Sequence, residues 1–127
     1  MEIRIISETE ILDVLKLIAK LFPKAYPVLK ENDQIYVAIE GEKIIGFLHM
    51  TEKEDKILLN GIGIVEEYRG KHVGTKLMGH LIDEAKDRPI YLKVTEKNFI
   101  AQALYEKFGF VPKRYGRRYV LVKSPEN

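Results

Sequence analysis

The chain has 127 residues, of which 46% are hydrophobic and 31% are charged, a balance typical of a soluble globular domain. This length predicts a single domain over residues 1–127. The formal net charge of +2 does not favour nucleic acid as a partner, although an excess of positive charge suits a small anionic ligand.

Several classes of protein are excluded by what the sequence lacks. No apolar run approaches the roughly 20 residues that a membrane span requires, and the N-terminus does not resemble a signal peptide. There is no cysteine, so disulfides, thiolate metal sites and a cysteine nucleophile are excluded. We therefore expect a cytoplasmic protein with no membrane partner and no metal.

The first predicted element is an amphipathic helix within residues 8–22, with Ser7 or Thr9 as its cap. Its predicted buried face consists of Ile11, Leu12, Leu15, Ile18 and Ala19. The segment PKAYP then ends the helix, and a short second helix or a turn should follow up to Glu31.

Three consecutive strands are predicted next. Residues 35–39 and 43–50 are β-rich runs on either side of a turn at Gly41, which predicts a hairpin. Residues 57–65 predict the third strand, and these neighbours should pair antiparallel.

The pattern changes after residue 65. A loop containing glycines precedes a helix whose apolar face should be Val73, Leu77, Leu81, Ile82 and Ala85. Residues 90–94 predict a further strand, and a strand–helix–strand order with short loops predicts a parallel crossover unit.

The last part of the chain predicts one more helix and a closing strand or hairpin. The helix lies in residues 98–110, with Asn98 as a cap and Gly109 as a stop. Its apolar side should be Ile100, Ala101, Leu104, Tyr105 and Phe108. Residues 114–123 form the closing element, and the whole chain is predicted as α/β (α+β) with a mixed, mainly antiparallel sheet.

The glycine loop is a candidate anion site. Gly70 and Gly74 let the backbone approach a pyrophosphate, the helix start offers unpaired N–H groups, and Arg69, Lys71 and Lys76 add positive charge. An ordinary helix start on a solvated surface explains the same residues. Neither G-x-x-x-x-G-K-[ST] nor G-x-G-x-x-G is present, so other phosphate loops fit poorly.

Two motifs carry a resemblance to a known family. In GIGIVEEYRGKHVGTKL, Arg69 and Gly74 match the ends of the pattern [QR]-x-x-G-x-[GA]. In NFIAQALYEKFGF, residues 98–110 match N-x-x-A-x-x-L-Y-E-K-x-G-F at every fixed position. With both motifs in this order, the chain from about Gln34 onwards resembles the GNAT superfamily of acyl-CoA-dependent N-acetyltransferases.

The resemblance implies helices on both faces of the sheet around a central β-α-β unit that binds acetyl-CoA, the acyl donor. The acceptor would be a small-molecule amine or a protein amine. Backbone groups of Ile62, Gly63 and Ile64 would pair with the pantetheine arm, Asn98 would bond to the same arm, and Tyr105 would protonate the departing thiolate. The residues implied at the pyrophosphate are Arg69, Gly70, Lys71, His72, Val73, Gly74 and Thr75.

The chain departs from the family pattern at the loop and at the base. His72 stands where the family has glycine, and a histidine would be strained there if the position needs positive φ. The family's two glutamate positions are Asn60 and Lys93 here, and neither residue is a suitable base. The substitutes are His49, Glu66 or Glu67, or a chain of water molecules.

His49 is the substitute base with suitable chemistry, because imidazole changes its charge near neutral pH. Strand alternation predicts that it faces the same side as Phe47 and Thr51. A water chain to bulk solvent is the least committed interpretation, and it predicts that replacing His49 lowers the rate only modestly.

The acceptor site should lie between residues 21–27 and the terminal segment 114–119. The candidate lining residues are Tyr26, Tyr115, Arg117, Arg118 and Tyr119, which would suit an amine bearing a carboxylate. Charges that merely keep a sheet edge soluble explain the same segment. Two other functions remain open, a non-catalytic acyl-CoA sensor and a small nucleic-acid-binding domain, as does a homodimer through the terminal strand.

Overall fold

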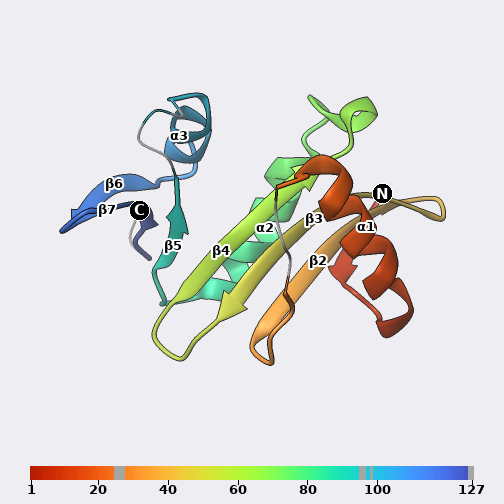
Figure 1. Ribbon diagram of the computed structural model, residues 1–127, viewed down its shortest axis with the longest axis horizontal. Coiled ribbons are helices and arrows are strands. Elements are labelled where there is room, and N and C mark those ends of the chain that lie inside the picture. Colours follow the sequence, from red (N-terminus) through yellow and green to blue (C-terminus); the bar gives the residue numbers. More distant parts are fainter. Residues whose placement is uncertain (25–27, 95–96, 98, 126–127) are drawn as a thin grey trace.

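The computed structural model describes residues 1–24, 28–94, 97 and 99–125, which form a seven-stranded sheet with helices against it (Figure 1). The strands are β1 (Glu2–Ile5), β2 (Asp33–Glu40), β3 (Lys43–Glu52), β4 (Ile57–Ile64), β5 (Ile90–Lys93), β6 (Val111–Tyr115) and β7 (Arg118–Lys123). The α-helices are α1 (Ile11–Leu21), α2 (Val73–Ala85) and α3 (Phe99–Glu106). No helix in these residues is long and apolar enough to cross a membrane.

The sheet has the order β1-β2-β3-β4-β5-β7-β6. Only β4 and β5 pair parallel, joined by the crossover through α2, and the other neighbours pair antiparallel. The predicted mixed, mainly antiparallel sheet with its β-α-β unit is therefore confirmed.

Helices cover both faces of this sheet, as the resemblance implied. In Figure 1, α1 lies in front of β2 and β3, and α2 lies behind the sheet. The alternation of strand side chains explains this arrangement. Val37 faces α1 and packs with Val14 and Ile18, whereas Ala38 belongs to the core that includes Leu77 of α2.

The predicted buried face of α1 was partly wrong. Val14 and Ile18 are the buried residues of this helix, whereas Leu12 is 62% exposed and Ala19 is also exposed. The polar residues Asp13, Lys16 and Lys20 form one stripe along α1, and the buried residues lie opposite it, whereas Leu12 and Ala19 lie at its margin. The buried side of α1 packs on Phe47 and the β2 side chains.

Other differences lie at the ends of the chain. β1 was not predicted, and its pairing with β2 stabilises a strand of only four residues. The possible second helix before Glu31 is absent from the described part of that segment. In α3, Leu104 is 49% exposed and Gln102 is buried instead. The predicted stop at Gly109 is confirmed by its positive φ of 95°.

The separation of β4 from β5 determines where the site lies in the sheet. β4 pairs with β3 as far as Ile64, but it pairs with β5 only through residues 57–59 opposite residues 90–92. Beyond that point the two strands diverge, as Figure 1 shows. The register also shifts between His49 and Met50, which leaves Asn60 as the extra residue of a bulge in β4. The divergence therefore begins at Asn60.

Candidate active site

The second half of β4 presents an unpaired backbone edge towards the divergence. Val65 donates its N–H to the Ile45 carbonyl at 2.9 Å, so this residue faces β3. In an antiparallel pair such residues alternate, so Gly63 also faces β3 while Ile62 and Ile64 turn their polar groups to the other side. These are the backbone groups that an added extended chain can pair with.

Arg69 fastens the glycine loop to this strand. Its Nε donates to the Ile64 carbonyl at 3.0 Å. The sequence placed Arg69 among the cofactor-binding residues, whereas the structure gives its Nε a contact with the protein backbone. Arg69 therefore sets the position of the loop relative to the open edge of β4.

The glycine loop leads directly into the uncapped start of α2. The first N–H groups of this helix belong to Val73, Gly74 and Thr75, and no side chain caps them. Gly70 has a φ of 77°, and a Cβ added to Gly70 or Gly74 would meet no atom within 4 Å. Lys71 lies over the Tyr68 ring, with its Nζ 5.1 Å from the ring centroid. The loop therefore presents open backbone donors at the positive end of a helix, which is the arrangement that binds phosphate.

His72 adopts the left-handed conformation that the family's glycine suggested, with φ 65° and ψ 16°. Its side chain is exposed, and a residue with a Cβ is strained in this region by roughly 1–2 kcal/mol. We expect His72→Gly to raise the melting temperature by about 4 °C, which corresponds to about 1 kcal/mol in a domain of this size. Thermal unfolding followed by circular dichroism measures this shift.

Gly70→Ala is the matched control for that substitution. Gly70 also has positive φ and open space around it, so alanine there adds only backbone strain and should lower the melting temperature. An unchanged melting temperature for His72→Gly would show that the conformation of His72 is not strained.

Tyr105 lies half-buried on α3, facing the main core. Its ring meets the Phe110 ring edge-on, with centroids 5.7 Å apart, and the hydroxyl makes no hydrogen bond to any described residue. Burial raises the pKa of Tyr105 above its ordinary value of 10.0. The phenol therefore keeps its proton at neutral pH, as a proton donor must. Asn98, the other predicted residue of this motif, lies outside the described residues.

A pocket of about 580 Å³ opens on the α1 face of the sheet. It is lined by Ile18, Phe22, Val28, Lys30, Asp33, Phe47, His49, Thr51, Asn60 and Gly61. His49 faces this pocket together with Phe47 and Thr51, as strand alternation predicted. The pocket reaches the bulge of β4, where the divergence from β5 begins.

His49 is held in this pocket by a buried carboxylate. Its Nε2 lies 2.9 Å from Oδ2 of Asp33, whose side chain is only 4% exposed. Thr51 donates its hydroxyl to Oδ1 of Asp33 at 2.7 Å and accepts a hydrogen bond from the Asn60 amide at 2.8 Å. The pair is thus connected to the bulge through a continuous set of hydrogen bonds.

The charge of Asp33 determines which nitrogen of His49 is available. Burial alone would raise the pKa of Asp33, but hydrogen bonds from Thr51, His49 and the Lys30 N–H lower it below its ordinary value of 3.8. An ionised carboxylate only accepts hydrogen bonds, so Nε2 of His49 must carry a proton. In neutral His49, Nδ1 is then the nitrogen with a free lone pair.

Asp33 was not singled out from the sequence, and regular pairing would have misplaced it. Counting back along the hairpin from its turn at Gly41 brings Asp33 opposite Met50, on the other face from His49. The register shift between Ala38 and Ile39 moves Asp33 opposite Thr51 and so onto the face of His49.

The other predicted site residues lie in different places. Glu66 and Glu67 are exposed, and Glu67 pairs with Lys43 at 3.7 Å, so both lie beside the loop. Tyr115 and Arg118 line a second pocket that also includes Lys93 and Asn60.

Tyr119 and Arg117 do not line either of these two pockets, so their place at the acceptor stays a prediction. Tyr119 lies opposite Arg114 in the β6–β7 pair, and its hydroxyl donates to Oε1 of the buried Gln102 at 3.0 Å. Tyr26 lies outside the described residues.

The comparisons with known proteins agree with this geometry. The model of the acetyltransferase (GNAT) family matches residues 7–110, so the chain belongs to this family and is an acyltransferase. A [ribosomal protein bS18]-alanine N-acetyltransferase of Haemophilus influenzae is 36% identical over 118 residues, which cover 84% of this chain and 80% of that relative.

Solved structures share the fold at lower identity. The ribosomal-protein-S18-alanine N-acetyltransferase from Escherichia coli has a TM-score of 0.77 at 23% identity, covering 95% of this chain and 90% of that one. The PaiA N-acetyltransferase from Thermoplasma acidophilum, solved in complex with coenzyme A, has a TM-score of 0.75 at 17% identity, covering 98% and 99%. The predicted family and fold are therefore confirmed.

Proposed function

We propose that this protein is a cytoplasmic enzyme that transfers the acetyl group of acetyl-CoA to a primary amine by direct attack. The observation that carries the proposal is the unpaired edge of β4, which leads through the glycine loop to the uncapped start of α2. A pantetheine arm can extend the sheet along Ile62 and Ile64 while the pyrophosphate meets the N–H groups of the helix. The relative solved with coenzyme A supports the same ligand.

The acetyl thioester would then lie where β4 and β5 diverge, with the amine approaching from the pocket on the α1 face. Attack forms the C–N bond and moves charge onto the carbonyl oxygen, where an N–H group of the free β4 edge can stabilise it. Collapse of this intermediate breaks the C–S bond. Tyr105, with its retained proton, serves as the general acid to the CoA thiolate.

His49 is the group best placed to take the proton from the amine. It is paired with Gly61 on the adjacent strand, so it lies about 5 Å from the backbone of β4. Asp33 orients the imidazole and leaves Nδ1 able to accept the proton, directly or through one water molecule. This arrangement supplies a base where the glutamates of the family are absent.

The test is calorimetric titration with acetyl-CoA, using ATP and NAD as controls for selectivity. We expect micromolar, selective binding of acetyl-CoA, and an affinity at least thirtyfold weaker in Gly74→Glu, because a carboxylate at the helix start repels the pyrophosphate. Gly79→Glu is the matched control, since Gly79 is in the same helix and also has no atom within 4 Å of an added Cβ.

Equal binding of ATP, NAD and acetyl-CoA would remove the basis of the proposal. Selective binding of acetyl-CoA without acetylation of any amine would instead favour the non-catalytic sensor.

A further inference from the structure

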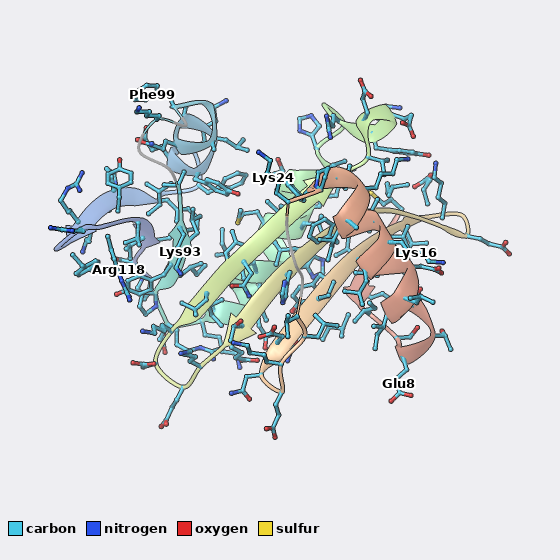
Figure 2. The ribbon with its side chains drawn as sticks, viewed as in Figure 1. Glu8, Lys16, Lys24, Lys93, Phe99 and Arg118 are labelled. Atoms are coloured by element: carbon cyan, nitrogen blue, oxygen red, sulfur yellow. The ribbon has the colours of Figure 1, made fainter. Side chains whose placement is uncertain are left out.

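The face of the sheet that carries His49 continues beyond α1, and no helix of the described residues covers it there (Figure 1). Residues that lie opposite each other on neighbouring strands share a face of the sheet. Leu58 of β4 lies between Thr51 of β3 and Tyr91 of β5, so all three are on the face that carries His49. Tyr91 and Lys93 are two residues apart on β5, so Lys93 shares the face of His49. Figure 2 shows Lys93 on β5 and Arg118 on the part of the sheet that lies away from α1.

This open half of the face holds a second pocket, of about 600 Å³. Its lining includes four cationic side chains, those of Lys53, Lys56, Lys93 and Arg118, and no carboxylate. The two pockets share Asn60, so the basic pocket begins where the first pocket reaches the bulge.

The four cations are not neutralised by neighbouring acids. Among the described residues none of them forms an ion pair, whereas Arg88 in the same region pairs with Glu52 at 2.9 Å. The Tyr115 hydroxyl and burial raise the pKa of Tyr91, with a smaller contribution from the Asp55 carboxylate. Glu54 and Asp55, which lie between Lys53 and Lys56 in the chain, do not line the pocket. The pocket keeps a positive charge that a ligand can neutralise.

The spacing between the pockets limits the size of that ligand. Paired strands lie about 4.8 Å apart, and β4 and β5 have diverged at the level of Arg118, so β7 with Arg118 lies at least about 10 Å from β4 across β5. An extended peptide advances about 3.3 Å per residue and therefore covers this distance in about three residues. A peptide with its terminal amine at the bulge would bring its next side chains over Lys93 and Arg118.

We propose that the acceptor is the N-terminal amine of a protein or peptide with acidic side chains at its second to fourth positions. This inference rests on the proposed acetyl transfer and adds the class of acceptor to it. The amine lies between the thioester and His49, and the acidic side chains lie in the basic pocket. The four cations thus select the acceptor and take no part in the transfer of the acetyl group.

The experiment compares three peptides of the form Ala-Xaa-Xaa-Xaa-Gly-Ser-Gly, in which Xaa is Glu, Gln or Lys. We expect kcat/KM to be about tenfold higher for the Glu peptide than for the Gln peptide at low salt, and lowest for the Lys peptide. The preference should shrink at high salt, because exposed charges are screened.

Charge variants of the basic pocket test whether its cations cause the preference for the Glu peptide. In the double variant Lys93→Gln and Arg118→Gln, the ratio of kcat/KM between the Glu and Gln peptides should fall close to one. Arg118→Glu should shift the preference towards the Lys peptide. Lys16→Gln is the matched control, because Lys16 projects from α1 on the opposite side of the molecule from Arg118 (Figure 2).

Three results would overturn the inference. Equal acetylation of the three peptides would do so while leaving the acetyltransferase intact, as would selective binding of acetyl-CoA with acetylation of other amines only. Tighter binding of a single-stranded oligonucleotide than of the Glu peptide, lost in the same double variant, would assign the pocket to nucleic acid instead.

Discussion

Replacing Tyr105 with phenylalanine should lower kcat by roughly 10²–10⁴-fold while leaving the affinity for acetyl-CoA unchanged. The substitution removes only the hydroxyl that protonates the CoA thiolate. Because burial raises the pKa of this phenol, the proton is present throughout the neutral range in the unmodified enzyme. The measurement is steady-state release of free CoA thiol, combined with calorimetry of acetyl-CoA binding.

The melting temperature of Tyr105→Phe is the control for this prediction. The Tyr105 hydroxyl makes no hydrogen bond to a described residue, and the ring contact with Phe110 survives in phenylalanine. The melting temperature should therefore stay within about a degree, since no buried partner is left unsatisfied. A variant that keeps more than a third of the activity would show that the thiolate leaves without help from Tyr105.

Replacing His49 with glutamine should lower kcat/KM by roughly 10²-fold, the usual range for loss of a general base. The loss should appear in kcat/KM with the acceptor amine and not in the affinity for acetyl-CoA, because His49 contacts the amine and not the cofactor. Asp33→Asn should have an effect of similar size, since an amide can donate to Nε2 and reverse which nitrogen of His49 carries the proton. The double variant should be little worse than either single one, because the two residues act as a unit.

The pH dependence of stability distinguishes the loss of catalysis in these variants from unfolding of the protein. The pKa of Asp33 is lowered in the folded state, so its stabilising contribution is complete above its ordinary value of 3.8 and is lost only as the pH falls below that value. A loss of activity in His49→Gln or Asp33→Asn that is measured above this pH with an unchanged fold therefore reports on catalysis and not on unfolding. A loss of less than tenfold in His49→Gln would favour the water chain as the route for the proton.

Local sequence patterns were sufficient to predict most of the helices, strands and turns. The turn at Gly41, the stop at Gly109 and the apolar stripe from Val73 to Ala85 each depend on neighbours within a few residues, and each was predicted correctly. The family motif left open whether position 72 needs positive φ, and the structure shows that it does, with φ 65° at His72. Short-range patterns carry this information because turns and helices are stabilised by contacts close in sequence.

The sequence by itself thus determined the order of the elements from β2 onwards, the family and the loop that is proposed to bind the pyrophosphate. The pairing of His49 with Asp33 and the basic pocket around Lys93 were decided only by the tertiary structure. These features depend on strand register and on where β5 and β7 lie beside β4. Residues far apart in sequence meet there, and a shift of one residue in register would turn each of those side chains to the other face.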